Sequence, residues 1–283
     1  MTSRVRLLLA SSHPGPTVTV TVLATVIAAA SGHPLALVVL VALAVLLGQL
    51  SIGLANDWID ADRDRAVGRT DKPVALGLIS AQAVRGAALA TAVAAGLLSL
   101  PLGPVAASAH LVLVAAGWAY DAGLKRTLWS VAPFVVAFGL LPVVAVAAGD
   151  GRLPAWWVIA TGAVFGVAIH CTNVLPDLVD DEATGVHGFP HRLGLRLSGV
   201  VAFGSLVVAA LLVLGGQLLG DDPVRGGGVT LAAVGTFAVV VLAAAGIRLV
   251  RTGPPTRTLF RLVIAASLVL VVGIGLAGAR LVG

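Results

Sequence analysis

The sequence predicts an all-α membrane protein in which nine transmembrane helices form a bundle of two parallel repeats. Three observations lead to this prediction: long apolar stretches recur along the chain, charged residues are scarce, and one polar motif occurs twice. Only 11% of the 283 residues are charged, against about 25% in soluble domains, and the mean hydropathy is +1.04. The strands of a membrane barrel would alternate apolar and polar residues, and these stretches do not.

Nine apolar segments are long enough to cross a bilayer, and Gly and Pro punctuate several of the short connections between them. The predicted spans are residues 16–31, 35–55, 82–100, 104–121, 129–149, 154–174, 197–219, 228–247 and 259–280. Several spans are rich in Ala and Gly, which allows helix backbones to pack closely in lipid. No N-terminal signal peptide is evident, because Pro14 and Pro16 interrupt the short apolar run. We expect residues 1–283 to form one polytopic domain.

The distribution of Lys and Arg determines the predicted orientation. With the N-terminus in the cytoplasm, fifteen of the 18 basic residues fall on the inner side, and only Arg152, Arg225 and Arg280 fall outside. Basic inner loops also explain the pI of 10.6, so no nucleic-acid partner is expected. A preference for Ala, Val, Leu, Gly and Arg is typical of high-GC bacteria. We expect an integral protein of a bacterial plasma membrane, surrounded by lipid, with both polar motifs cytoplasmic.

The polar motif occupies residues 56–77 and recurs at residues 173–194 without a gap. The first copy reads NDWIDADRDRAVGRTDKPVALG and the second reads NVLPDLVDDEATGVHGFPHRLG. Eight residues recur at a constant offset of 117: Asn, Asp, Asp, Ala, Gly, Pro, Leu and Gly. Four spans separate the copies, so the two halves of this duplication point the same way across the membrane.

Each copy presents three oxygen-bearing side chains at positions i, i+4 and i+8, which share one face of a helix. The members of the two rows are Asn56, Asp60 and Asp64, then Asn173, Asp177 and Asp181. Two such rows facing one cavity would repel each other unless cations lay between them. Mg²⁺ prefers oxygen ligands and completes its shell with water and substrate phosphate. We therefore predict that these six residues hold Mg²⁺ against a diphosphate.

A purely structural role is the alternative interpretation of the acidic residues, as solvated helix ends paired with basic neighbours. It suits the first copy, where Arg63 and Arg65 are adjacent. It does not suit the second copy, which has four acidic residues and no Lys or Arg before Arg192. The metal site is therefore the preferred interpretation.

Basic residues near the motif also suit a diphosphate. Arg69 and Lys72 follow the first row, and Lys125 and Arg126 follow the fourth span within the segment YDAGLKR. A guanidinium fork and an ammonium group bind phosphate oxygens and stabilise the charge that develops on a leaving diphosphate.

On these residues the sequence resembles the UbiA-type superfamily of intramembrane prenyltransferases. The first motif is similar to the family pattern N-D-x-x-D-x-x-x-D-x-x-x-x-R-x-x-R-P, and the second to D-x-x-x-D followed by Gly and Pro. The segment from Tyr120 to Lys125 is similar to the family's Tyr/Lys motif after the fourth span. The resemblance covers essentially the whole chain and implies a helical bundle around a central cavity that opens to lipid.

The resemblance implies a Mg²⁺-dependent transfer of a prenyl group from a prenyl diphosphate to a small aromatic acceptor. Asp60, Asp64, Asp177 and Asp181 would be catalytic. Diphosphate contacts would come from Arg69, Lys72, Tyr120, Lys125 and Arg126. The sequence leaves two alternatives open: a terpene cyclase on the same scaffold, and a transporter of a divalent cation or phosphorylated solute.

The chain departs from the family pattern at two positions. Lys72 stands where the family usually has Arg, and Gly188 stands where many members have Thr. We interpret His13 as a loop residue. His170 lies within a span, where a histidine either faces a cavity or bonds to a neighbouring helix.

Overall fold

The computed structural model describes residues 2–176, 178, 185–219, 227–253 and 257–283, and this part of the chain is almost entirely helical. The long helices are α2 (Pro14–Ala30), α3 (Leu35–Ile59), α5 (Ala81–Ser99), α6 (Pro104–Ala122), α7 (Ala132–Val146), α8 (Trp156–Val174), α10 (Phe189–Leu219), α11 (Gly227–Thr252) and α12 (Arg257–Gly275). The short ones are α1 (Thr2–Ala10), α4 (Ala61–Ala66), η1 (Leu100–Leu102), η2 (Leu124–Arg126), η3 (Leu128–Val131) and η4 (Gly278–Leu281). A single isolated β-bridge, Pro154 to Val282, accompanies them in the described residues.

Each of the predicted spans coincides with one long helix. Among the described residues, seven helices are long and apolar enough to cross a membrane, and the pair α1–α2, bent by 73°, would add an eighth. The described apolar part of α12, Arg261–Gly275, is shorter than the others. The chain is thus an all-α integral membrane protein, and the count of nine crossings remains a prediction.

Two helix boundaries differ from the prediction at the polar motifs. α3 continues past residue 55 to Ile59, because the start of the first motif is itself helical. α10 begins at Phe189, although the prediction began at residue 197, and a non-helical Gly194 separates its first turn from the rest. The motifs are therefore built into the helix ends.

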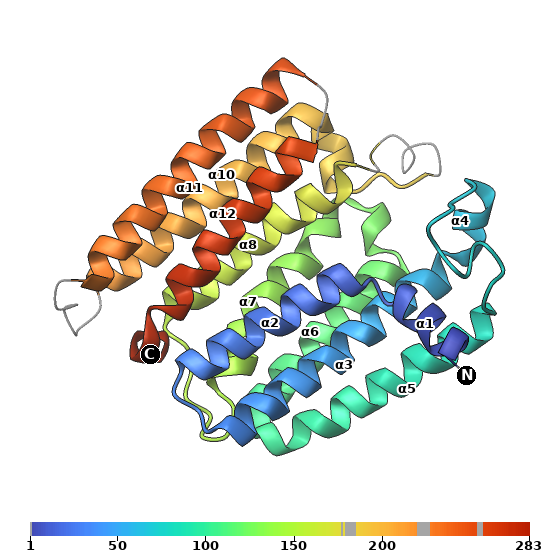
Figure 1. Ribbon diagram of the computed structural model, residues 1–283, viewed down its shortest axis with the longest axis horizontal. Helices are drawn as coiled ribbons and strands as arrows, with labels where there is room; N and C mark the ends of the chain where they lie inside the picture. The colour runs from blue at the N-terminus through green and yellow to red at the C-terminus, as the bar shows by residue number, and fades with distance from the viewer. Residues whose placement is uncertain (1, 177, 179–184, 220–226, 254–256) are drawn as a thin grey trace.

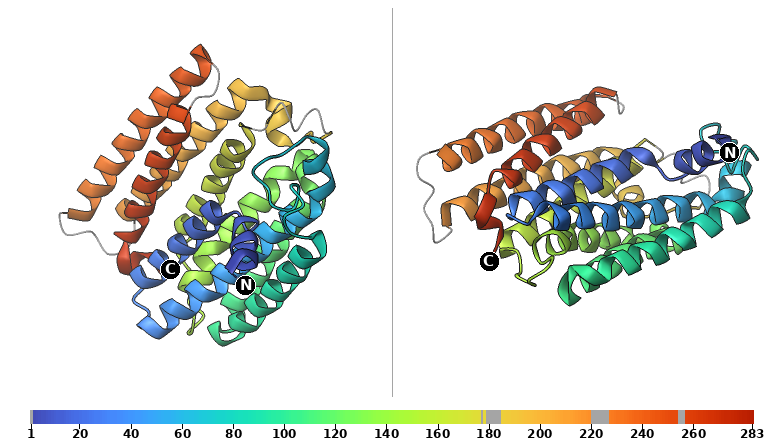
Figure 2. Two further views of the ribbon diagram at one scale, coloured as in Figure 1. Left: turned by 45° about the vertical axis from the view of Figure 1, so that its right-hand side comes forward. Right: turned by 60° about the horizontal axis from the view of Figure 1, so that its bottom comes forward.

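Seven helices form a closed ring in which each packs against the next: α2, α3, α6, α7, α8, α10 and α12, with α12 returning to α2. α5 lies outside α3, and α11 lies outside α10 and α12 (Figures 1 and 2). These outer helices expose large apolar side chains such as Val93, Leu97 and Phe237, which suits contact with lipid.

The duplication seen in the sequence is also present in the backbone. Adding 117 to the residue numbers of α2, α3, α5 and α6 gives ranges that overlap α7, α8, α10 and α11, respectively. The motif-bearing helices α3 and α8 both end toward the side of the molecule where α4 lies (Figure 1). Three glycine pairs at this offset share a positive φ, which glycine adopts without steric cost. They are Gly32 and Gly149 (81° and 86°), Gly68 and Gly185 (71° and 77°), and Gly77 and Gly194 (69° and 70°).

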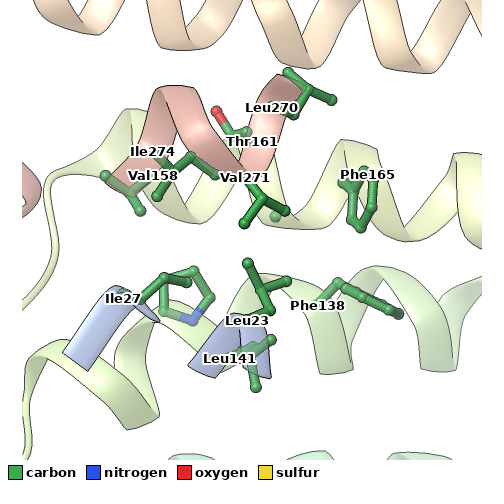
Figure 3. Close-up of a pocket in the computed structure, with 12 residues that line it drawn as sticks. Leu23, Ile27, Phe138, Leu141, Val158, Thr161, Phe165, Leu270, Val271 and Ile274 are labelled. Carbon is green, nitrogen blue, oxygen red and sulfur yellow. The ribbon is translucent and has the colours of Figure 1, made fainter. Parts of the chain in front are cut away.

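An apolar pocket lies inside the ring between α2, α7, α8 and α12 (Figure 3). Leu23, Phe138, Phe165 and Val271 approach it from the four helices. Its volume is about 20 Å³, enough for roughly one water molecule.

A larger apolar groove of about 350 Å³ lies between α10, α11 and α12, and none of its lining residues belongs to the polar motifs.

The close packing of α7 on α8 positions the aromatic residues between the pocket and the polar motifs. A Cβ at Gly162 would meet the Phe138 carbonyl at 2.2 Å, and a Cβ at Gly166 would meet the Phe134 carbonyl at 2.4 Å. The G-x-x-x-G spacing on α8 therefore lets the backbones of the two helices touch.

Candidate active site

The first polar motif forms the end of α3 and the short helix α4. The N–H of Asp60 donates to the Asn56 carbonyl at 2.9 Å, and the N–H of Asp64 donates to the Asp60 carbonyl at 2.8 Å. This i to i−4 pattern carries helical geometry through the junction, so Asn56, Asp60 and Asp64 share one face as their spacing predicts.

Lys125 binds the middle carboxylate of this row. Its Nζ lies 2.6 Å from both Oδ1 and Oδ2 of Asp60, and both side chains are buried. The guanidinium Nη2 of Arg63 lies 3.3 Å from Oδ2 of the same carboxylate. Lys125 belongs to η2, directly after α6, so a segment 65 residues away in sequence closes over the first motif.

Lys72 joins the other members of the row. Its Nζ lies 3.1 Å from Asn56 Oδ1, 3.2 Å from Asp57 Oδ1 and 2.9 Å from Asp64 Oδ2. Burial opposes the charged ammonium, but the carboxylates of Asp57 and Asp64 outweigh burial, so the pKa of Lys72 is raised above its usual value. Lys72 is therefore a permanent cation at physiological pH.

Three residues that the sequence analysis did not select complete the cluster. Asp57 is buried beside Lys72, and Asp121 Oδ1 accepts a hydrogen bond of 2.8 Å from Asn56 Nδ2. His13, interpreted from sequence as a loop residue, has Nε2 only 3.3 Å from Asp57 Oδ1. Asp121 had a sequence signal, since it is an acidic residue at the end of an apolar span. His13 had none.

Other predicted site residues lie apart from this cluster. Arg69 makes two bonds of 2.8 Å to Asp71, which lower the pKa of that carboxyl to about 2. Arg126 and Asn173 are exposed. The predicted ligands Asp177 and Asp181 lie outside the described residues.

Tyr120 contacts aromatic rings beside the charged cluster. Its ring meets Phe134 edge-on with centroids 5.1 Å apart, and it meets His170 at 5.8 Å. The Phe134 and His170 rings are 4.7 Å apart. These three rings lie between Asp121, at the end of α6, and Phe138, which lines the apolar pocket one turn along α7 from Phe134.

The charged cluster combines four buried carboxylates with two buried ammonium groups. Asp57, Asp60, Asp64 and Asp121 face Lys72 and Lys125. Oδ2 of Asp57 and Oδ2 of Asp121 are buried and have no hydrogen-bond partner in the described part of the chain. Within those residues no three His, Cys, Asp or Glu side chains converge as a ready metal site. This cluster therefore has carboxylate oxygens to spare, but the described residues alone do not form a complete metal site.

Comparison with known proteins agrees with these features. The profile of the UbiA prenyltransferase family matches residues 17–269. The 4-hydroxybenzoate octaprenyltransferase of Burkholderia mallei (strain NCTC 10247) is 30% identical over 196 residues, which are 68% of this chain and 65% of that protein. Its counterpart in Ralstonia nicotianae is 29% identical over 192 residues, 65% of this chain and 62% of that protein. The match thus spans slightly less than two thirds of these curated relatives.

Solved structures share the fold. A UbiA homologue from Archaeoglobus fulgidus bound to GPP and Mg²⁺ has a TM-score of 0.71 at 14% identity, over 96% of this chain and 99% of that chain. A UbiA homologue from Aeropyrum pernix K1 has a TM-score of 0.72 at 20% identity, over 92% and 97% of the two chains. Since the family profile covers most of the sequence and the described helices adopt this fold, the chain belongs to the UbiA prenyltransferase family.

Proposed function

We propose that this protein transfers a prenyl group from a prenyl diphosphate to a small aromatic acceptor within the membrane, in a Mg²⁺-dependent reaction. The observation that carries this proposal is the row of Asn56, Asp60 and Asp64, whose two carboxylates are buried and whose members are held by the ammonium groups of Lys72 and Lys125. Burying so many charges beside a membrane span is costly, and such residues are typically functional.

The donor atoms of the cluster fit Mg²⁺. They are carboxylate and amide oxygens, and ammonium groups show that the cluster accommodates cations. The carboxylate oxygens without a hydrogen-bond partner among the described residues, Asp57 Oδ2 and Asp121 Oδ2, belong to neighbours of the row. We assign Asn56, Asp60 and Asp64 as ligands from the first motif, with Asn173, Asp177 and Asp181 from the second. When bound, Mg²⁺ would neutralise charge on the diphosphate.

In the proposed reaction the allylic C–O bond of the donor breaks, and its electron pair leaves with the diphosphate. An aromatic carbon of the acceptor forms the new C–C bond, and the C–H bond at that carbon then breaks, with its proton passing to the released diphosphate. Lys72 and Lys125 are the buried cations placed to donate hydrogen bonds to the departing phosphate oxygens. Arg69 and Arg126, nearer the surface, are assigned to the outer oxygens of the diphosphate. Tyr120 is assigned to the end of the diphosphate that faces the apolar pocket.

The prenyl chain is assigned to the aromatic and apolar column along α7 and α8. Phe134, Phe138 and Leu141 follow one another on α7, and Phe165 faces Phe138 from α8 with ring centroids 5.5 Å apart. The pocket has room for only about one water molecule, so donor binding must widen it.

The orientation is proposed from charge, with the N-terminus and both motifs in the cytoplasm. The lone Cys171 is buried, so a cysteine-specific, membrane-impermeant reagent will report only on introduced cysteines. In intact cells, Arg152→Cys should be labelled and Asp62→Cys should be protected until the membrane is permeabilised. The reverse pattern would overturn the orientation.

The test of function uses the full-length protein in lipid nanodiscs with a labelled prenyl diphosphate. We expect a prenylated product with 4-hydroxybenzoate and Mg²⁺, and none after EDTA treatment. A cyclised product formed without an acceptor would identify a cyclase instead. Uptake of Mg²⁺ or prenyl diphosphate into vesicles without turnover would identify a transporter.

A further inference from the structure

His170 is a fully buried histidine on α8, one turn before Asn173 of the second motif. Its Nε2 lies 2.9 Å from the hydroxyl of Ser130, which is also fully buried. The backbone N–H of Phe189, in the first turn of α10, donates to the same hydroxyl oxygen at 2.7 Å. Ser130 therefore links α8 with the later part of the second motif.

This arrangement assigns the tautomer of His170. The Ser130 oxygen already accepts the Phe189 N–H, and its own proton has no acceptor in the described residues except His170 Nε2. The imidazole Nε2 is therefore the acceptor, and in the neutral ring the proton is on Nδ1. Nδ1 is buried and has no hydrogen-bond partner among those residues. An unpaired buried N–H is unfavourable, so a ligand oxygen that accepts from it would be favoured.

A second buried histidine shows that this arrangement is not general. His110 on α6 has Nδ1 2.6 Å from the Ser99 hydroxyl, and that hydroxyl donates to the Ala95 carbonyl at 2.6 Å. His110 Nδ1–H therefore donates to Ser99, and the unpaired Nε2 carries a lone pair and no proton. This Nε2 packs against α3, where a Cβ at Gly48 would lie 2.7 Å away. His110 thus has no unused proton to donate to a ligand.

The surroundings of His170 favour an aromatic ligand. Phe134 and Tyr120 contact its ring, the buried His191 is near enough to interact with it electrostatically, and no buried Lys or Arg has a described contact with it. Phosphate oxygens would be drawn to Lys72 and Lys125 instead. A neutral donor flanked by aromatic rings suits a flat molecule with one hydrogen-bond-accepting oxygen.

We propose that His170 is the binding residue for the acceptor, with Nδ1–H donating to a phenol or carboxylate oxygen and the acceptor ring lying against Phe134 and Tyr120. This inference rests on the proposed function and specifies its acceptor site. Ser130 is a positioning residue, because it fixes which nitrogen of His170 carries the proton.

The first test is binding of 4-hydroxybenzoate to the full-length protein in nanodiscs, measured by calorimetry in the presence of Mg²⁺ and a non-hydrolysable prenyl diphosphate analogue. We expect His170→Phe to weaken this binding about tenfold and to leave binding of the donor analogue within twofold. His170→Asn, whose amide nitrogen replaces Nδ1, should recover most of the affinity. His170→Gln, whose amide lies nearer Nε2 and Ser130, should not.

Phenol and benzoate identify which oxygen is recognised. The analogue that lacks it should bind the wild type and His170→Phe equally. His110→Phe is the matched control, expected to lower the melting temperature without changing acceptor affinity. Equal acceptor affinity in wild type and His170→Phe, or equal loss of donor and acceptor binding, would overturn the inference.

Binding and turnover separate this inference from the proposed function. If acceptor binding depends on His170 but the wild type forms no prenylated product, the proposed function fails and the binding site stands. If prenylated product forms, and wild type and His170→Phe have the same KM for the acceptor, the proposed function stands and the inference fails.

Discussion

The two ends of the helical bundle contain ion pairs of the same length in opposite surroundings. Lys125 and Asp60 are 2.6 Å apart with side chains only 5% and 2% exposed. Arg152 and Asp150, at the other end, are also 2.6 Å apart, but their side chains are 55% and 48% exposed. A surface pair contributes about 0–1 kcal/mol, whereas a buried pair carries a desolvation cost that its attraction only partly offsets. Function is therefore expected at the end of the bundle where the charged side chains are buried.

Removing a carboxylate from the buried end should have the largest effect. Asp60→Asn keeps the shape but loses one charged ligand and the partner of Lys125, so we expect prenyl transfer to fall by about a hundredfold or more. Asp150→Asn is the matched control at the exposed end and should keep wild-type turnover. Equal turnover in both variants, measured on folded protein, would remove the functional distinction between the ends.

Removing the buried cation should primarily affect stability. Lys125→Met leaves the Asp60 carboxylate buried without its ammonium partner, a change that costs about 3–5 kcal/mol in buried pairs. If Asp60 also binds Mg²⁺, added Mg²⁺ should raise the melting temperature of Lys125→Met more than that of wild type. A melting temperature that is indifferent to Mg²⁺ in both proteins would argue against Asp60 as a ligand.

Gly188 tests whether the second motif must dock closely on the first half of the molecule. A Cβ there would lie 2.7 Å from the Lys125 carbonyl and 2.8 Å from the Ser130 hydroxyl. Gly188→Thr, the residue common in the family, should therefore destabilise this chain by about 1–3 kcal/mol in denaturation experiments. Gly204→Ala is the control, since nothing lies within 4 Å of its Cβ position. Wild-type stability of Gly188→Thr would mean that the segment relaxes freely.

Lys72→Arg should have the smallest effect. It restores the family residue and keeps the charge, but the larger guanidinium must fit among Asn56, Asp57 and Asp64. We expect the KM for the donor to change by only a few-fold, with kcat largely preserved. A loss as large as that of Asp60→Asn would show that Lys72 is not equivalent to the family arginine.

Features that depend on local sequence were predictable. The apolar runs located every long helix, because apolar length alone decides whether a segment can span a bilayer. The duplication at an offset of 117 residues was readable as well, and its positive-φ glycines agree with it. The row of Asn56, Asp60 and Asp64 followed from helical periodicity.

Contacts between distant segments were decided only by the tertiary structure. His13 reaches Asp57 because α1 and α2 are sharply bent, and Gly53 lets the Ser12 backbone approach α3. Ser130 meets His170 across 40 residues of sequence, and no spacing rule brings those two side chains together. The sequence by itself thus determined the helices, the repeat and the acidic row, because these depend on local periodicity and composition. Tertiary structure decided which buried charge and which histidine nitrogen found a partner, because those pairings depend on how closely the helices pack.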